Sequence, residues 1–139
     1  MYRESQAQAA AQVLVVAFNG FVLGLARGTG QVLWQHTLYA RETIELVVGE
    51  LFVVACTRTT LWCIDYPSGR MVGTADFPVP LETRPSILFD GGVLFVAAGG
   101  QVYSYSTQGQ LQWQSNLSAL GNTRMALGFP FNVRQEDTY

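Results

Sequence analysis

The sequence predicts an all-β fold, a β-propeller of four-stranded antiparallel blades with three blades in the chain. Three observations predict it. A pattern of about forty residues recurs three times, each copy reads as short apolar strands joined by tight turns, and several strands are apolar on both faces. A blade enclosed between two neighbouring blades gives its strands that doubly buried environment.

The repeat is visible as three aligned segments, 13–34, 51–73 and 93–113. Each segment opens on a run of apolar residues and closes on a strand that follows a second turn. The turn glycines and the residues four positions after them recur at the same period, which fixes the alignment. These recurring positions are Gly30, Gly69 and Gly109 for the turns, and Trp34, Gly73 and Trp113 for the closing strands.

Strands and turns can be placed within each copy. Asn19-Gly20 and Gly99-Gly100 are typical hairpin turns, because only Gly and Asn adopt positive φ at low cost. The strands 13–18 and 51–56 carry apolar residues on both faces. We therefore expect these strands to be buried on both sides.

A further strand precedes two of the copies, Ile44–Gly49 before the second and Ser86–Asp90 before the third. An equivalent segment, Arg124–Phe129, follows the third copy and is expected to have no further strand after it. The first copy has no leading strand, because residues 1–12 are polar and rich in Ala and Gln. With the four strands of a blade lettered A to D, the chain reads BCD–ABCD–ABCD–A.

The predicted organisation is an N-terminal extension followed by half of a propeller. Three blades are too few to close a ring, because propellers typically have four to eight, and an open end would expose apolar faces. Two copies would give six blades, so a homodimer is expected in which 123–129 of one chain adds to 13–18 of the other. The alternative is a fragment of a larger protein or a hetero-assembly. The predicted boundaries are 1–12 for the extension and 13–139 for the propeller half, with blade 1 (strands B to D) at 13–38, blade 2 at 43–77, blade 3 at 83–117 and the exchanged strand at 123–129.

Composition narrows the functional classes. The net charge of −2 and the scattered arginines argue against nucleic acid as a binding partner, because such a partner requires a basic face. No secretory leader and no apolar run of membrane-spanning length is present in the sequence, so no membrane insertion and a cytoplasmic location are expected. All eight cations are Arg, as in the proteins of a high-GC bacterium. Cys56 and Cys63 are expected to be reduced, buried and apolar in character.

The repeat resembles the PQQ-like (quinoprotein-type) β-propeller family, whose pattern runs V-Y-V-G-x-x-D-G-x-L-Y-A-L-D-x-x-T-G-x-x-L-W. Residues 13–34 match it without a gap and 93–113 match it with one deletion. The resemblance implies WD40-like blades and structural docking roles for Trp34 and Trp113 with the turn glycines Gly30, Gly69 and Gly109. At Gly73 the tryptophan is replaced, which leaves the packing of the second blade open.

The family includes quinone-dependent dehydrogenases and non-enzymatic scaffolds such as outer-membrane assembly factors. The adjacent cysteines and clustered carboxylates that the enzymes use are not found in this sequence, so no catalytic, cofactor or metal site and no cofactor is expected. His36 is expected to be a surface or edge histidine, and Asp65 to cap a turn.

Arg84 and Arg124 are the candidate binding residues. They occupy equivalent places before two innermost strands, where guanidinium groups could bind an anion or a partner at one mouth of the channel. The alternative is that each pairs with a neighbour such as Glu82 or faces solvent.

The sequence therefore favours a non-enzymatic interaction or scaffold module with an unidentified protein partner. The alternatives are a propeller that binds a small molecule or quinone-like ligand, and a fragment of a larger PQQ-repeat protein.

Overall fold

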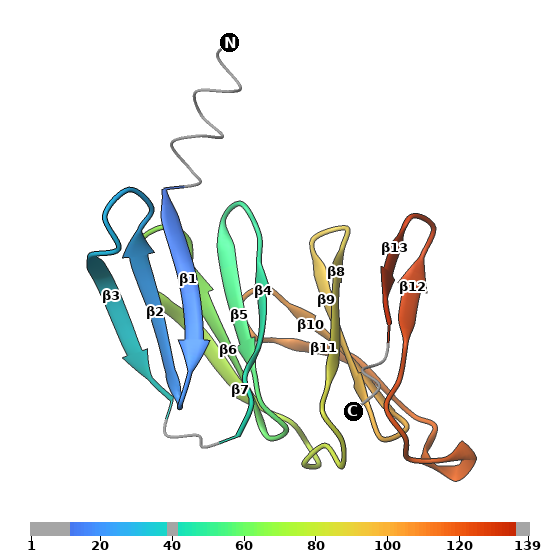
Figure 1. Ribbon diagram of the computed structural model, residues 1–139. Coiled ribbons are helices and arrows are strands. Elements are labelled where there is room, and N and C mark those ends of the chain that lie inside the picture. Colours follow the sequence, from blue (N-terminus) through green and yellow to red (C-terminus); the bar gives the residue numbers. More distant parts are fainter. Residues whose placement is uncertain (1–11, 39–41, 136–139) are drawn as a thin grey trace.

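The computed structural model describes residues 12–38 and 42–135. Most of the predicted N-terminal extension, 1–12, and the last residues of the chain therefore lie outside the described residues. Within them the fold is all-β, as expected, and its antiparallel sheets stand side by side along the chain (Figure 1). The strands of each sheet follow one another in sequence order, so each sheet is a meander.

The first sheet has three strands: β1 (Val13–Phe18), β2 (Phe21–Ala26) and β3 (Val32–Thr37). The second sheet has four: β4 (Glu45–Val48), β5 (Phe52–Cys56), β6 (Thr60–Asp65) and β7 (Met71–Asp76). The third sheet also has four: β8 (Ser86–Asp90), β9 (Val93–Ala98), β10 (Gln101–Ser106) and β11 (Leu111–Asn116). A single 3-10 turn, η1 (Ser118–Leu120), and a hairpin of β12 (Leu127–Phe129) and β13 (Asn132–Arg134) follow.

The predicted turns explain how each sheet folds back on itself. Asn19 and Gly20 connect β1 to β2 with φ of 50° and 80°, which is the left-handed geometry of a two-residue hairpin turn. Gly99 and Gly100 make the same turn between β9 and β10 with φ of 58° and 83°. These turns fix the antiparallel pairing, in which Phe18 lies opposite Phe21.

The C-terminal segment differs from its prediction. The strand expected over Arg124–Phe129 is limited to β12 and is followed by a second strand, β13, whereas none was expected. The turn between them is Pro130-Phe131, and Phe131 adopts a φ of 64°. The sequence did not indicate a turn here, because Pro130-Phe131 replaces the Gly91-Gly92 pair that forms the equivalent turn of the third sheet. Positive φ is normally expected of Gly or Asn and not of Phe.

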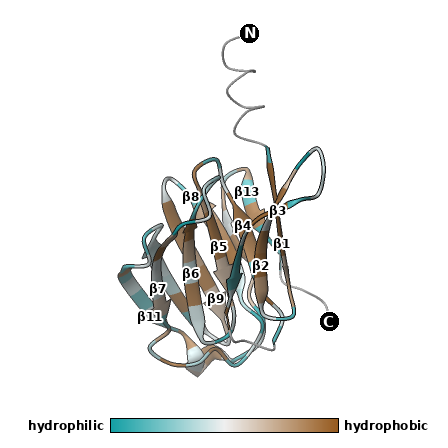
Figure 2. Cartoon of the chain, turned by 90° about the vertical axis from the view of Figure 1, so that its left-hand side faces the viewer, coloured by the Kyte–Doolittle hydropathy of each residue, from teal (hydrophilic) through white to brown (hydrophobic). Residues whose placement is uncertain are grey.

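Two apolar clusters hold the sheets together. The larger lies between the second and third sheets and includes Leu61, Leu94 and Tyr103, all buried. The smaller joins the first and second sheets around Val22, Val53 and Ile64. Figure 2 shows apolar residues along the strands of these sheets. Of the two strands predicted to be buried on both faces, β5 is so, and Val53 to Cys56 have no exposed surface. The prediction is wrong for β1, where Leu14 and Phe18 are exposed because no sheet of the described residues covers the outer face of the first sheet.

Candidate interaction surfaces

Trp34 on β3 joins the first sheet to the second. Its indole lies over Gly69, where a Cβ atom would overlap the ring, and its Nε1 donates a hydrogen bond to the carbonyl oxygen of Pro67 at 3.0 Å. His36, two residues on and on the same side of β3, places Nε2 2.5 Å from the carbonyl oxygen of Gly69. The turn that precedes β7 is thus held by a ring and two polar contacts.

His36 was expected on the surface or at an edge. It does lie on the edge strand of its sheet, but it is half-buried and contacts the neighbouring sheet. The centroids of the His36 imidazole and the Trp34 indole are 5.8 Å apart. The signal that could have predicted this contact is the two-residue spacing from Trp34, because alternate residues of a strand share one face.

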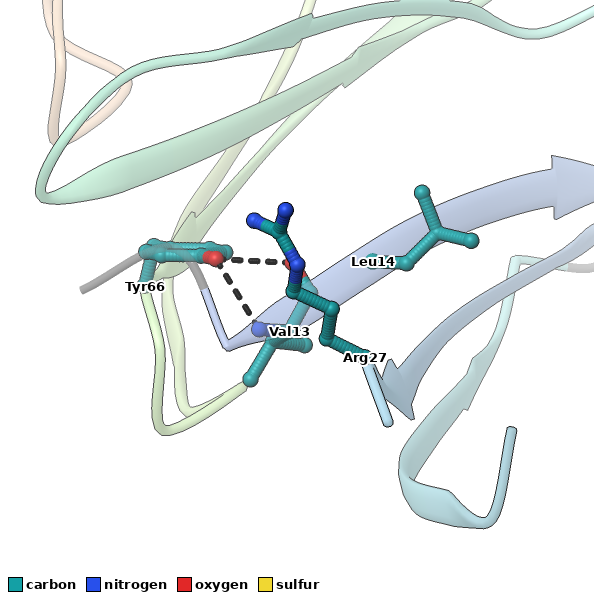
Figure 3. Close-up of a pocket in the computed structure, with 4 residues that line it drawn as sticks. All are labelled: Val13, Leu14, Arg27 and Tyr66. Carbon is teal, nitrogen blue, oxygen red and sulfur yellow. Dashed lines mark hydrogen bonds between the residues drawn. The ribbon is translucent and has the colours of Figure 1, made fainter. Parts of the chain in front are cut away.

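A second link between these sheets surrounds the hydroxyl of Tyr66. This hydroxyl donates to the carbonyl oxygen of Val13 at 2.7 Å and accepts from the backbone N–H of Val13 at 3.2 Å. A shallow hollow opens here and is lined by Val13, Leu14, Arg27 and Tyr66 (Figure 3). Of the polar groups of the hollow, the Tyr66 hydroxyl is engaged in holding β1 against the second sheet.

The second and third sheets meet without a tryptophan. Gly73 on β7 stands at the position of Trp34, and a Cβ atom there would overlap the carbonyl oxygen of Gln108. The turn before β11 therefore lies against the backbone of β7. Sequence reasoning left this junction open, and the structure shows that direct backbone approach replaces the indole.

The two cysteines lie within this second junction. Both are free and buried, as expected. Burial raises the pKa of the Cys63 thiol to about 11, and burial followed by the charges of Glu45 and Glu42 raises the pKa of Cys56 well above its usual value. A thiol kept protonated is a poor nucleophile, so these two are suited to packing.

Asp65 caps the turn that Trp34 covers. The hydroxyl of Ser68 donates to its carboxylate at 2.5 Å, and its own carbonyl oxygen accepts from the N–H of Gly69 at 2.9 Å. This is the turn-capping role expected from the sequence. It places a carboxylate next to the docking glycine, with one of its oxygens engaged by Ser68.

The predicted binding arginines lie near the start of the inner strands. Arg84, two residues before β8, forms an ion pair with Glu45 on β4, whose side chain is largely buried. Arg134 on β13 lies 3.7 Å from the other oxygen of Glu45. Arg124 precedes β12 at the equivalent place, and the hydroxyl of Ser86 donates to the carbonyl oxygen of Met125 at 2.5 Å, which keeps the two segments adjacent.

Glu45 is the residue that sequence reasoning missed in this cluster. The expected neighbour for Arg84 was Glu82, which instead accepts a hydrogen bond from Asn122 at 2.9 Å. Because Arg84 already has a carboxylate partner, its charge is neutralised in part where an anion was expected to bind. Anion or partner binding at Arg84 and Arg124 remains a prediction.

The outer face of the third sheet ends in an uncovered tryptophan. Trp113 on β11 occupies the same repeat position as Trp34, and 48% of it is exposed. Its ring contacts Phe95, with centroids 6.1 Å apart, and Phe95 in turn contacts Phe129 of β12 at 5.2 Å. The β12–β13 hairpin therefore covers the inner part of this face, and the outer part around Trp113 stays open.

No group of three or more His, Cys, Asp or Glu side chains that could hold a metal ion occurs within 12–38 and 42–135. Across the same ranges, no helix has the length and apolar character needed to cross a membrane.

A family model described as outer membrane protein assembly factor BamB matches residues 19–129. No curated protein matches the sequence significantly. The match covers most of the chain and agrees with the resemblance to PQQ-like repeats. It makes the expectation of a cytoplasmic location wrong, because an outer membrane assembly factor points to the cell envelope.

Solved structures with similar folds include natural and designed proteins. BamB from Moraxella catarrhalis is 19% identical over 78% of this chain and 35% of its own, with a TM-score of 0.56. The computationally designed Ika8 protein is 16% identical over 88% and 42%, with a TM-score of 0.66. Sqt1 from Saccharomyces cerevisiae is 15% identical over 89% and 36%, with a TM-score of 0.63. At these identities the likeness is one of fold. The matched part of each of these proteins is less than half of its length.

Proposed function

The chain belongs to the family described as outer membrane protein assembly factor BamB, and from this premise we propose that it is a non-enzymatic protein-interaction module of the cell envelope. The family supports a role in holding other proteins, and the fold supports one too, because propellers present broad faces and loops on a rigid frame. Fold alone does not determine activity. The family match is the observation that carries the proposal.

We further propose that the sheets are propeller blades, and that two copies of the chain complete one ring of six. β1 is an edge strand, and among the described residues β12 pairs with β13 alone. β12 pairs with β13 along the edge by which β4 pairs with β5 and β8 with β9, so this closure requires β1 of the second copy to replace β13 at that edge. Such strand addition supplies main-chain hydrogen bonds.

The exposed apolar side chains of β1 support this closure. On β1, Leu14 is 59% exposed and Phe18 is 60% exposed, whereas Val53, Val54 and Ala55 of the equivalent strand β5 are fully buried. Contiguous apolar surface of this kind usually marks an interface. A second copy would cover both ends with one repeated junction.

Sedimentation equilibrium tests the dimer. The chain has a mass of 15.3 kDa, so a closed pair is expected at about twice that mass and is expected to persist on dilution, because each junction buries a blade face and two junctions close the ring. A stable monomer at micromolar concentration would contradict this closure.

Binding to an unfolded outer membrane protein tests the interaction role. We expect the immobilised dimer to retain a purified β-barrel outer membrane protein diluted from denaturant, and to retain much less of a helical protein treated in the same way. Equal retention of both would contradict a specific role. Native mass spectrometry of the purified protein provides the second arm, since a retained small molecule would favour the ligand-binding alternative.

A further inference from the structure

The chain contains one complete example of a docking contact and two unmatched halves of the same contact. In the complete example, Trp34 lies over Gly69 and donates its Nε1 proton to the carbonyl oxygen of Pro67. The ring belongs to one sheet and the turn to the next sheet along the chain. Each junction of this type therefore needs a tryptophan from one side and a glycine turn from the other.

The first unmatched half is Trp113. It stands four residues after its own turn glycine, as Trp34 does, and on the same closing strand of its sheet. The indole of Trp34 is covered by the next turn, whereas Trp113 is 48% exposed and no turn within residues 12–38 and 42–135 lies over it. An indole at the centre of an apolar surface is the kind of side chain that contributes most to protein interfaces.

The second unmatched half is the turn of the first sheet. Gly30 has a φ of 76°, close to the 79° of Gly69, and an added Cβ atom would meet nothing within 4 Å. Gly28 stands two residues earlier, at the place of Pro67, and its surroundings are equally open. The turn glycine thus has the backbone conformation of Gly69, but no ring of the described residues lies over it.

The two halves cannot meet within one molecule. The turn of the first sheet and the face of the third sheet are separated by the whole of the second sheet (Figure 1). A second copy presents the missing half at each end. We propose, building on the dimer of the proposed function, that Trp113 of one copy docks over Gly30 of the other and donates its Nε1 proton to the carbonyl oxygen of Gly28.

The repeat also indicates how this junction differs from its template. His36 contributes a second polar contact to the turn glycine in the complete example, and its counterpart two residues after Trp113 is Ser115. The shorter hydroxyl side chain does not extend as far as an imidazole. The junction between copies therefore depends more heavily on Trp113 than the junction within the chain depends on Trp34.

Mixed cysteine cross-linking tests the docking directly. Thr29→Cys marks the turn and Ser115→Cys marks the strand of Trp113. Mild oxidation with oxidised glutathione is expected to produce a disulfide-linked pair when the two variants are mixed and allowed to exchange, but not from either variant alone. The native Cys56 and Cys63 are fully buried and contribute no background. Equal linkage of a single variant with itself would overturn the head-to-tail arrangement.

Replacement of the indole provides the second test. Trp113→Ala is expected to weaken association at least tenfold in Kd. The matched control is Leu120→Ala, which removes an apolar side chain that is 87% exposed on η1 and has no docking role; its dimer is expected to be unchanged. A dimeric wild type with no mixed disulfide and an unaffected Trp113→Ala variant overturns the docking alone, whereas a monomeric wild type overturns the dimer as well.

Discussion

Two junctions connect the three large sheets, and they differ at one position of the repeat. Between the first and second sheets, Trp34 extends an indole over Gly69 and bonds to Pro67. Between the second and third sheets, Gly73 has no side chain, and the carbonyl oxygen of Gln108 lies where one would start. At this repeat position the neighbouring sheets are in contact through a large ring in the first junction and through backbone atoms in the second.

The difference teaches that neighbouring sheets need contact at this position rather than a particular residue. An indole fills a wide gap and adds a polar bond, while a glycine lets the gap close. The first solution depends on a side chain and the second on the absence of one. Each junction should therefore fail in its own way when the residue is changed.

Gly73→Ala should break the second junction and have the largest effect. The new methyl group would overlap a backbone carbonyl oxygen, which cannot move as a side chain can. Overpacking of this kind destabilises by about 1 to 3 kcal/mol, and we expect a loss of about 3 kcal/mol. Urea unfolding followed by circular dichroism measures it.

Gly28→Ala is the control for that measurement, and both glycines are changed in the Trp113→Ala background so that no indole of a second copy lies over the Gly28 turn. It also adds a methyl group to a glycine, but into open space, and Pro67 shows that this turn position accepts a Cβ atom. Its free energy of unfolding should change by less than about 0.5 kcal/mol. Similar losses in both variants would show that Gly73 is not held by close packing.

Trp34→Ala should open the first junction. The variant loses the buried part of the indole and the hydrogen bond to Pro67. Full removal of a buried tryptophan costs about 3 to 5 kcal/mol, and Trp34 is only half-buried, so about 2 to 3 kcal/mol is expected. Unfolding at two protein concentrations a hundredfold apart separates this effect from dimer dissociation.

Trp113→Ala provides the comparison under those conditions. Because no turn among the described residues covers Trp113, the variant should lose mainly the part of the stability that depends on protein concentration, together with the smaller contribution of its contact with Phe95. Equal, concentration-independent losses in both variants would remove the distinction between a docked and an uncovered tryptophan.

Alkaline pH should weaken the second junction more than the first. Burial raises the pKa of Cys63 to about 11 from an ordinary value of 9.0. Below pH 9 both the folded and the unfolded chain keep this proton, so stability is unaffected. Between about pH 9 and pH 11 only the unfolded chain loses it, and this thiol should contribute about 2 kcal/mol to the fall in the free energy of unfolding.

Cys63→Ala identifies the source of that loss. The variant is less stable at neutral pH but should show a smaller fall between pH 9 and pH 11. Burial also raises the pKa of Cys56 well above its usual value, and it raises the pKa of Tyr105 to about 12, so part of the alkaline fall remains in this variant. An identical slope in wild type and variant would assign the alkaline loss to other groups.

Most of the fold could be predicted from the sequence because the repeat and its turns are local signals. Asn19-Gly20 indicated a hairpin, and the apolar segment 51–56 indicated a buried strand. The turn at Pro130-Phe131 could not be predicted, since neither residue favours positive φ and only tertiary contacts stabilise it there. Asn132 supplies two of these contacts, to the carbonyl oxygen of Phe89 at 2.8 Å and to Asp90 at 3.0 Å.

The candidate surfaces were less predictable because they depend on contacts between repeats. The positions of Trp34 and the turn glycines were visible in the pattern, and the carboxylate of Asp65 was correctly placed in a turn. The partner of Arg84 was not, because Glu45 and Arg84 are 39 residues apart in sequence and meet only when two inner strands lie side by side. Sequence spacing indicates position within a sheet better than it indicates neighbours across sheets.

His36→Phe should give the smallest change and refine the comparison at the first junction. A phenyl ring keeps the aromatic contact with Trp34 but cannot donate to the carbonyl oxygen of Gly69. The loss of one hydrogen bond is expected to cost about 1 kcal/mol, measured by urea unfolding. Ser115→Ala is the matched control, because Ser115 occupies the same repeat position on a strand with no turn opposite it in its own chain, and its concentration-independent stability should not change. If His36→Phe has no effect either, the indole alone holds the first junction, and the histidine only fills the space beside it.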